Sequence, residues 1–420
     1  MPRCRKVAKR RRRGMVRRCF HGDEVPSVTF SCLRQCGLAL MMSMAAILPG
    51  LAETAEPGTA EPGTAEPGTA NPPPEVTADA LSLSTVFKPM ERIWGIDFLP
   101  DGRAIVTERP GRLSILGKPG DKPIPIEGVP AVFVLNHAGL LDVHLDPHFK
   151  DNQLLYLSYV VGSDDSSSMR LMRARLDGHK LADAKIIYEA GPFVPGSENW
   201  GGRIAIDGQG FLFLSLGDRL QDWWRAQDLS QSWGKIIRIR TDGAIPEDNP
   251  FAHVPGARKE IWSYGHRNPQ GLAIDPKTGT LWEVEHGPQG GDEVNIIKPG
   301  RNYGWPVITY GIGYDNAKVG IGTHAPGLEQ PVYYFKPSIA TSGLEITQEG
   351  SPWGHALWVG GLATEILVKL TLEGERVTGE ERFLEGEIGR VRVVRAAPDG
   401  SLYLGADEDE SGVYRVAPKQ

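Results

Sequence analysis

Apolar and polar residues alternate with a period of two in six separate stretches of the chain, and a Gly- or Pro-bearing turn interrupts each stretch. This pattern is typical of β-hairpins, in which two short strands are joined by a tight turn. The stretches follow one another at intervals of about 45–75 residues, as expected for repeated units that carry loop insertions. They cover residues 96–107, 141–158, 204–216, 272–284, 344–360 and 393–405.

Patterns of amphipathic helices are almost absent between these hairpins, so each repeated unit is predicted to consist of strands. Six such units predict an all-β fold, a six-bladed β-propeller, over residues 80–420. The apolar segment 81–87 is expected to supply the strand that completes the last blade. Two β-sandwiches are the structural alternative, but no linker divides this region.

The first 79 residues differ from this body. Residues 37–49 form an apolar run that is too short to span a bilayer, and the small residues of Gly50-Leu51-Ala52 follow it. We therefore predict that residues 1–52 are an Arg-rich head and signal peptide. Residues 53–79 repeat EPGTA three times before NPPP and are expected to be a disordered linker. The mature protein is then periplasmic or secreted, without a stable membrane span.

Charge and cysteines narrow the range of functions. The first 52 residues hold 11 of the 46 Lys/Arg and 2 of the 52 Asp/Glu, which leaves 35 basic and 50 acidic residues in the remainder. An acidic body argues against nucleic acid as a partner, because phosphate binding requires a basic face. All four cysteines lie in the head, so the body has neither a disulfide framework nor a thiolate metal site.

Residues 261–306 carry the densest candidate chemistry. Within them the carbonyl groups of Gly287-Pro288 precede the carboxylate of Glu293 by a few residues. Carbonyl and carboxylate oxygens suit a hard cation such as Ca²⁺. A tight turn beside a solvated glutamate would also explain an isolated Gly-Pro pair.

Several long motifs in this segment read GHRNPQGLA, EHGPQGGDEVN and GRNYGWP, and upstream stretches read HAGLLDVHLDPHF and WGGRIAIDGQGFLFLSLGD. Together they resemble the soluble quinoprotein aldose (glucose/sorbosone) dehydrogenases, over about residues 85–416. The resemblance implies a propeller that binds pyrroloquinoline quinone (PQQ) and Ca²⁺ over its channel mouth. An aldose substrate would be oxidised at its anomeric carbon to a lactone. A base would take the hydroxyl proton, hydride would pass to the quinone, and an unidentified soluble or membrane acceptor would then take the electrons.

The resemblance also implies roles for individual residues. Gly287 and Pro288 would supply carbonyl ligands to the cofactor calcium, and Glu293 and Tyr303 would form a further calcium-binding pair. Cofactor contacts are expected from Arg267, Asn268, Arg390, Arg392 and His137. Two residues apart on a strand, the two late arginines would share a face and could fork onto carboxylates, although a salt-bridged strand face would look the same.

Three positions depart from the family pattern. Asn199 stands where the family keeps its catalytic histidine, and an amide cannot accept a proton at neutral pH. Losing a general base typically costs about 10²–10⁴-fold in rate. Ala363 replaces a cofactor-contacting lysine, and His137 stands where a glutamine is common.

These departures leave alternatives open. The base role could pass to Glu198, His286 or His137, or the substrate could be another polyol or an aldehyde hydrate. A non-catalytic propeller that binds sugar or quinone is a second hypothesis. A calcium-dependent lactonase-type hydrolase is a third, although such enzymes hold their metal through side-chain carboxylates rather than through Gly-Pro carbonyls.

Overall fold

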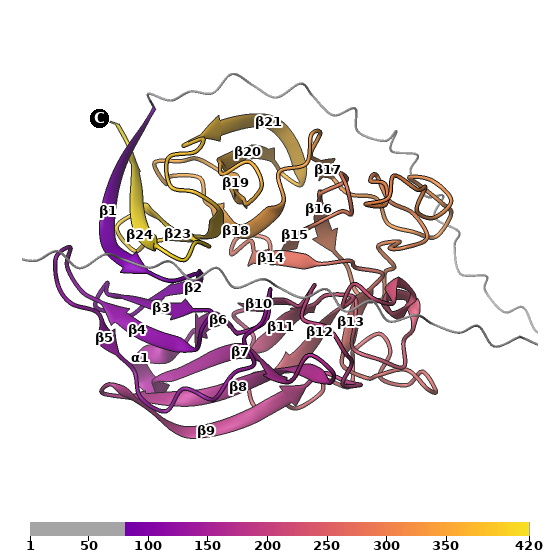
Figure 1. Cartoon of the computed structure of the whole chain (residues 1–420), viewed down its shortest axis with the longest axis horizontal. Helices are drawn as coiled ribbons and strands as arrows, with labels where there is room; N and C mark the ends of the chain where they lie inside the picture. The colour runs from indigo at the N-terminus through magenta and orange to yellow at the C-terminus, as the bar shows by residue number, and fades with distance from the viewer. Residues whose placement is uncertain (1–79, 420) are drawn as a thin grey trace, which may run out of the picture. The chain divides into compact units, whose positions relative to one another are not determined.

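The computed structural model describes residues 80–419, which belong to one compact unit. Within them, 24 strands form six four-stranded antiparallel sheets. The inner strands gather at the centre of Figure 1, and each contacts the inner strands of the two adjacent sheets, in a closed cycle. The predicted six-bladed β-propeller is therefore confirmed. The predicted signal peptide (1–52) and linker (53–79) lie outside the described residues.

The blades follow the chain, and within each one the strands run from the inside to the outside. The first two blades contain β2 (Ile93–Phe98), β3 (Ala104–Glu108), β4 (Arg112–Leu116) and β5 (Ile124–Pro125), then β6 (Leu140–Leu145), β7 (Leu154–Gly162), β8 (Ser167–Asp177) and β9 (Lys180–Glu189). The next two contain β10 (Gly201–Ile206), β11 (Phe211–Leu216), β12 (Lys235–Arg240) and β13 (Ile261–Tyr264), then β14 (Pro269–Ile274), β15 (Leu281–Glu285), β16 (Glu293–Ile297) and β17 (Tyr333–Tyr334). The last two contain β18 (Thr341–Thr347), β19 (Ala356–Gly361), β20 (Leu367–Glu373) and β21 (Arg376–Phe383), then β22 (Val391–Ala396), β23 (Leu402–Ala406), β24 (Ser411–Pro418) and β1 (Leu81–Met90).

Each of the six predicted hairpins forms the two innermost strands of one blade. In the third hairpin, residues 204–216, hydrogen bonds within the turn explain why the chain reverses direction there. Asp207 Oδ1 accepts hydrogen bonds from the main-chain N–H groups of Gln209 and Phe211, and Gly210 takes a φ of 79°. Only glycine adopts that conformation without strain, so the turn is specified by its own residues.

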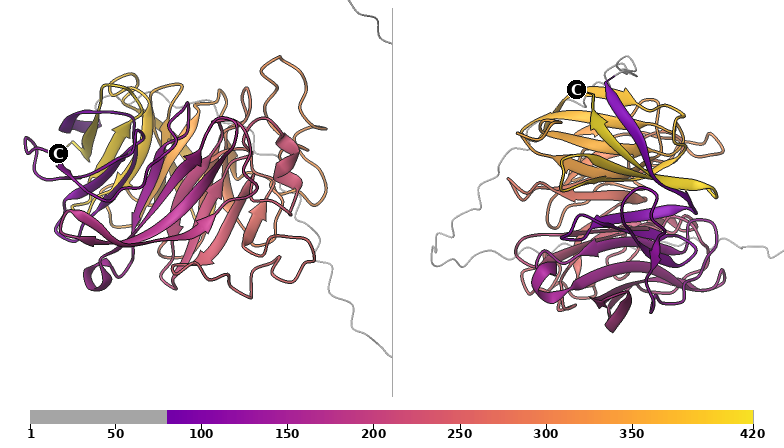
Figure 2. Two further views of the ribbon diagram at one scale, coloured as in Figure 1. Left: turned by 60° about the horizontal axis from the view of Figure 1, so that its bottom comes forward. Right: turned by 90° about the vertical axis from the view of Figure 1, so that its left-hand side faces the viewer.

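The last blade joins the two ends of the described chain. Strand β1 pairs antiparallel with β24, with Leu81 opposite Pro418 and Thr85 opposite Tyr414. The indigo β1 lies beside the yellow C-terminal strand in the right-hand view of Figure 2. This confirms that segment 81–87 completes the last blade.

One arginine, Arg203, is the hub of the propeller, because it bonds to several blades at the centre of the ring. Arg203 of β10 donates to the main-chain carbonyl oxygens of Trp94 (2.9 Å), Gln270 (2.7 Å) and Arg392 (2.7 Å). It also pairs with the Asp142 carboxylate at 3.1 Å. These partners belong to β2, β14, β22 and β6, so this buried side chain links five blades.

Helical structure in residues 80–419 is limited to α1 (Phe149–Asn152) and the 3₁₀ helix η1 (Trp223–Gln227). Neither is long or apolar enough to cross a membrane, and no other helix is present in the described part of the chain.

Candidate active site

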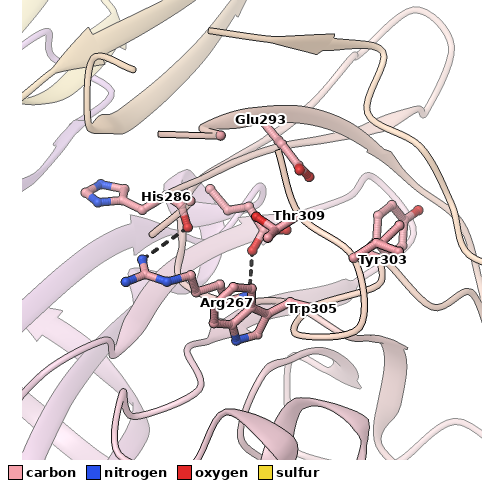
Figure 3. A pocket seen from close by; sticks show the side chains of 10 residues that line it. Arg267, His286, Glu293, Tyr303, Trp305 and Thr309 are labelled. Carbon is pink, nitrogen blue, oxygen red and sulfur yellow. Dashed lines mark hydrogen bonds between the residues drawn. The ribbon is translucent and has the colours of Figure 1, made fainter. Parts of the chain in front are cut away.

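A pocket opens where the fourth blade (β14–β17) meets its long loops. It lies between the segment before β14, the turn after β15 and the insertion that connects β16 to β17 (Figure 3). The lining residues are Arg267, Glu285, His286, Gly287, Gly291, Glu293, Tyr303, Trp305, Ile308 and Thr309. Five of the predicted site residues, Arg267, His286, Gly287, Glu293 and Tyr303, therefore come together here.

Arg267 is held rigidly at one wall of this pocket. Its main-chain N–H donates to Glu285 Oε2 at 2.6 Å, and its Nη1 donates to the His286 carbonyl at 3.2 Å (Figure 3). The guanidinium carbon lies 5.4 Å from the Trp305 ring centroid and 6.0 Å from that of Tyr314. Its Nε is buried without a hydrogen-bond partner, so a fixed cation retains an unused donor.

His286 lies beside Arg267 and is also incompletely bonded. Its Nε2 is buried and has no partner, and the same is true of Thr341 Oγ1. Burial lowers the pKa of His286 well below its usual range, and the positive charges of Arg267 and Arg392 lower it further. His286 is therefore neutral in this site. Buried polar atoms without partners are rare in folded proteins, so these groups suit a polar ligand. Arg267 Nε and Thr341 Oγ1 can donate to it, and the role of His286 Nε2 follows from the tautomer of the ring.

The Gly287-Pro288 turn is tightly packed. A Cβ on Gly287 would lie 2.0 Å from the Gly290 carbonyl oxygen and 2.5 Å from that of Gly291, so only glycine fits. Asp292 fixes the turn by accepting hydrogen bonds from the N–H groups of Gly287 (3.1 Å) and, across the blade boundary, Ala340 (2.6 Å). Main-chain carbonyl oxygens are thus concentrated beside His286.

A buried acidic cluster lies behind the pocket. The side chains of His266, Glu283 and Glu285 each offer one atom that could bind a metal ion, and these three atoms lie within 4.8 Å of one another. Asn295 donates to Glu283 Oε2 at 3.0 Å, while Glu283 Oε1 has no partner. Burial and the neighbouring Glu285 raise the pKa of Glu283 and of Glu293 well above the usual range. Uncompensated buried carboxylates of this kind are candidate cation ligands.

The predicted calcium pair, Glu293 and Tyr303, lines the same pocket. The Tyr303 hydroxyl, however, donates to the Ile296 carbonyl at 2.5 Å and accepts from the Lys298 N–H at 2.8 Å. Its ring stacks on His266, with centroids 4.7 Å apart. Only the main-chain oxygen of Tyr303 is therefore free to act as a ligand.

Arg390 and Arg392 occupy different surroundings. Arg392 is buried in the channel, where Nε donates to Asp407 Oδ2 at 3.1 Å and Nη1 donates to Gln270 Oε1 at 2.6 Å. Arg390 precedes β22 and donates to the Leu362 carbonyl at 3.2 Å. The pairing of β22 with β23 is irregular directly after Arg390, so regular alternation along a strand does not place the two side chains on one face.

The predicted base position lies on the adjoining blade. Asn199 is 4% exposed and donates from Nδ2 to Asp218 Oδ1 at 2.9 Å. Asp218 Oδ2 accepts from Trp305 Nε1 at 2.7 Å, and the Asp218 N–H donates to the Arg267 carbonyl at 2.8 Å. Burial raises the pKa of Asp218, and the charge of Arg267 opposes this. Asn199 is thus tied to the wall of the pocket, but through an amide that cannot accept a proton.

The remaining predicted residues lie around this position. Asn268 Oδ1 accepts hydrogen bonds from the Gly201 N–H (3.2 Å) and Gln270 Nε2 (3.0 Å), so it is committed inside the fold. His137 Nδ1 lies 2.7 Å from Glu198 Oε2 at the rim, where half of the His137 side chain is exposed.

Comparisons with known proteins agree with this arrangement. The sequence profile of the Glucose / Sorbosone dehydrogenase family matches residues 90–415. The chain belongs to the glucose/sorbosone dehydrogenase family. It is 39% identical over 338 residues to aldose sugar dehydrogenase YliI of Escherichia coli, with 79% of this chain and 91% of that protein covered. These matches identify it as an oxidoreductase of the sugar dehydrogenase type.

Solved structures of family members share the fold. The apo form of the soluble aldose sugar dehydrogenase from Escherichia coli superposes with a TM-score of 0.78 at 38% identity, over 81% of this chain and all of that one. The PQQ-bound aldose sugar dehydrogenase from Streptomyces coelicolor superposes with a TM-score of 0.65 at 28% identity, over 82% of this chain and all of that one.

The site of this glucose/sorbosone dehydrogenase also contains residues that the sequence motifs did not reveal. Tyr314 lies in the insertion between β16 and β17, Thr341 begins β18, and Asp218 joins Asn199 to Trp305. Glu283 and Glu285 had a detectable signal, because two glutamates alternate within the apolar strand 281–285 and so face the same side. Ala363, which stands where the family has a cofactor-contacting lysine, is exposed and provides no positive charge.

Proposed function

We propose that this sugar dehydrogenase oxidises an aldose or a related sugar at the anomeric carbon to a lactone, with PQQ and Ca²⁺ as cofactors. The observation that carries the proposal is the group of buried polar atoms without partners, Arg267 Nε, His286 Nε2 and Thr341 Oγ1, in or next to one pocket. PQQ is planar, and its carboxylate and quinone oxygens are all acceptors. Such a group would accept hydrogen bonds from Arg267 Nε and Thr341 Oγ1.

Residues of this chain would hold the cofactor by distinct means. Arg267 and Arg392 would offer charge-assisted hydrogen bonds to its carboxylates. Trp305 and Tyr314 flank the Arg267 guanidinium and limit its movement. Tyr314 is 69% exposed, so it is available to cover a bound ligand.

Calcium would bind through oxygen atoms of the same pocket. The carbonyl groups of Gly287 and Pro288 would contact the ion that accompanies the cofactor, and Glu293 with the main-chain oxygen of Tyr303 would hold a further ion. When bound, the quinone would accept hydride while Ca²⁺ acts as a Lewis acid on its carbonyl.

A binding titration tests the proposal. The purified protein is titrated with PQQ in the presence and absence of Ca²⁺, and sugar oxidation is then followed with an artificial electron acceptor. We expect Ca²⁺-dependent binding, weakened at least tenfold by Arg267→Met. Arg415→Met is the matched control, because Arg415 lies in an exposed ion pair with Asp399 on the last blade. Absence of PQQ binding under both conditions would refute the proposal.

The same samples separate the alternative functions. Cofactor binding without oxidation of any aldose would support a non-catalytic binding propeller. Hydrolysis of a lactone without quinone would support a lactonase-type hydrolase. N-terminal sequencing of protein recovered outside the cytoplasm tests the predicted export, with cleavage expected after Ala52.

A further inference from the structure

An imidazole–carboxylate pair lies beside the buried amide of Asn199. His137 precedes β6 and Glu198 precedes β10, so the two side chains come from neighbouring blades. We propose that His137 is the general base of sugar oxidation in this chain and that Glu198 is the residue that orients it. This inference rests on the proposed function, and it names the group that replaces the base missing at position 199.

The loops that carry the pair are fixed to each other. The His137 N–H donates to the Ser197 carbonyl at 3.2 Å, and Asn136 Nδ2 donates to Ser197 Oγ at 2.9 Å. His137 Nδ1 then lies 2.7 Å from Glu198 Oε2, and the main-chain N–H of Asn199 approaches the same atom at the longer distance of 3.4 Å. We assign the proton to Nδ1, because a carboxylate at the shorter distance can only accept. Nε2 therefore keeps a free lone pair, on a side chain that is half exposed.

The pair adjoins the pocket of the proposed cofactor. Asn199 connects to Asp218, and Asp218 bonds to both Trp305 and Arg267 of that pocket. A sugar lying between His137 and the pocket would thus have the base on one side and the proposed quinone on the other.

The other candidates are poorer bases. The Nε2 atom of His286 is buried and its ring feels the charges of Arg267 and Arg392, so accepting a proton would add a third positive charge. The hydrogen bond from His137 lowers the pKa of Glu198, which makes that carboxylate a weaker base. Asp218 uses both oxygens for Asn199 and Trp305. At His137, by contrast, the Glu198 carboxylate stabilises the imidazolium that forms.

The proposed step is balanced in atoms and electrons. The O–H bond of the anomeric hydroxyl breaks, and its proton moves to His137 Nε2. The electron pair of that bond forms the C=O bond of the lactone. The anomeric C–H bond breaks, and hydride carries its electron pair to the quinone. His137 then releases its proton to solvent through its exposed edge.

Chemical rescue tests the assignment. We expect His137→Ala to lower kcat by about 10²–10⁴-fold, with PQQ binding within threefold of wild type. Imidazole added to the assay should restore a part of the rate in proportion to its concentration, because the space left by the half-exposed His137 side chain would be open to solvent. Glu198→Gln should lower kcat less than His137→Ala, and imidazole should not rescue it. His148→Ala is the matched control, since this exposed histidine follows the opposite end of β6 and should keep wild-type activity.

The outcomes distinguish this inference from the proposed function. A fall in kcat of less than tenfold in His137→Ala, or a larger fall that imidazole does not restore, would overturn the role of His137. Either result leaves sugar oxidation by the wild-type protein intact. A wild-type protein that binds no PQQ and oxidises no sugar would overturn the proposed function and this inference with it.

Discussion

Replacing Asp407 by asparagine is expected to destabilise the protein strongly, although the change removes only one charge. Asp407 lies just after β23, and its side chain is 3% exposed. It accepts two hydrogen bonds from the guanidinium of Arg392, and Arg109 Nη1 lies 3.9 Å away. Both arginines are buried, so Asp407→Asn would leave two cations without their shared counter-ion.

Two arguments set the magnitude. Burial alone would raise the pKa of Asp407, but the charges of Arg392 and Arg109 outweigh burial and lower it from 3.8 to about 2. At about 1.4 kcal/mol for each pKa unit, this favours the charged form in the fold by about 2 kcal/mol. Removing one partner of a buried ion pair typically costs about 3–5 kcal/mol, because the remaining charge stays buried. We therefore expect a loss of about 2–5 kcal/mol.

Urea unfolding of the cofactor-free protein, followed by tryptophan fluorescence, measures this loss. The folded pKa of Asp407 lies below its unfolded value, so its stabilising contribution is complete above about pH 4 and disappears as the pH falls towards 2. The difference in unfolding free energy between wild type and Asp407→Asn should therefore be largest near neutral pH and shrink below pH 4.

The last blade contains a matched control. Asp399 also pairs with one arginine through Nε and a terminal nitrogen of Arg415, at 3.2 and 3.0 Å, but Asp399 is 53% exposed and Arg415 is 37% exposed. Asp399→Asn should cost at most about 1 kcal/mol. Equal losses in the two variants, or a loss below 1 kcal/mol for Asp407→Asn, would refute the reasoning from burial.

Three further substitutions probe the hub, the site loop and a buried amine. Arg203→Met should cost about 3–5 kcal/mol and lower the thermal midpoint, and an unchanged midpoint would show that the hub is dispensable. Gly217→Ala places a Cβ 2.2 Å from the Asn199 carbonyl oxygen and should lower kcat/KM more than tenfold, whereas Gly208→Ala meets nothing within 4 Å and should not. Lys235→Met removes three donors to main-chain carbonyls and should cost about 1–3 kcal/mol in urea unfolding; no loss would mean that water replaces the amine.

The fold could be predicted because its signals are local. Alternation and turn residues identify each inner hairpin, and the apolar segment 81–87 had no partner nearer in sequence than the C-terminal strand. The long insertion between β16 and β17 has no such period, so nothing in its sequence indicated that Tyr314 would lie near Arg267. The sequence pointed to the pocket through uninterrupted motifs, which carry Arg267, His286 and Gly287 in a short stretch.

Residues that meet only in three dimensions were harder to find. The pairing of His137 with Glu198 joins segments 61 residues apart, and neither segment has a periodicity that implies the contact. The sequence likewise did not indicate that Asn268 and the Tyr303 hydroxyl form hydrogen bonds within the fold, because residue type alone does not reveal which hydrogen bonds are already made. Strand alternation alone does not fix the direction of the Arg390 side chain, because this residue precedes β22 and the pairing of that strand begins irregularly.

The hydrogen bonds of Arg203 at the hub affect which side chains at the centre of the propeller can be substituted. Three of its four partners are carbonyl oxygens, which every amino acid possesses, and the Arg392 carbonyl also accepts from Ser342 of the remaining blade. Mutations at Trp94 or Gln270 can therefore change the side chain and preserve the bond to Arg203, whereas Arg392 is also held by its buried pair with Asp407. The side chains of Gln270 and Arg392 also bond to each other, at 2.6 Å. Side chains around the axis can therefore vary in chemistry while the axis keeps its geometry, which would allow new substrates to be explored without rebuilding the scaffold.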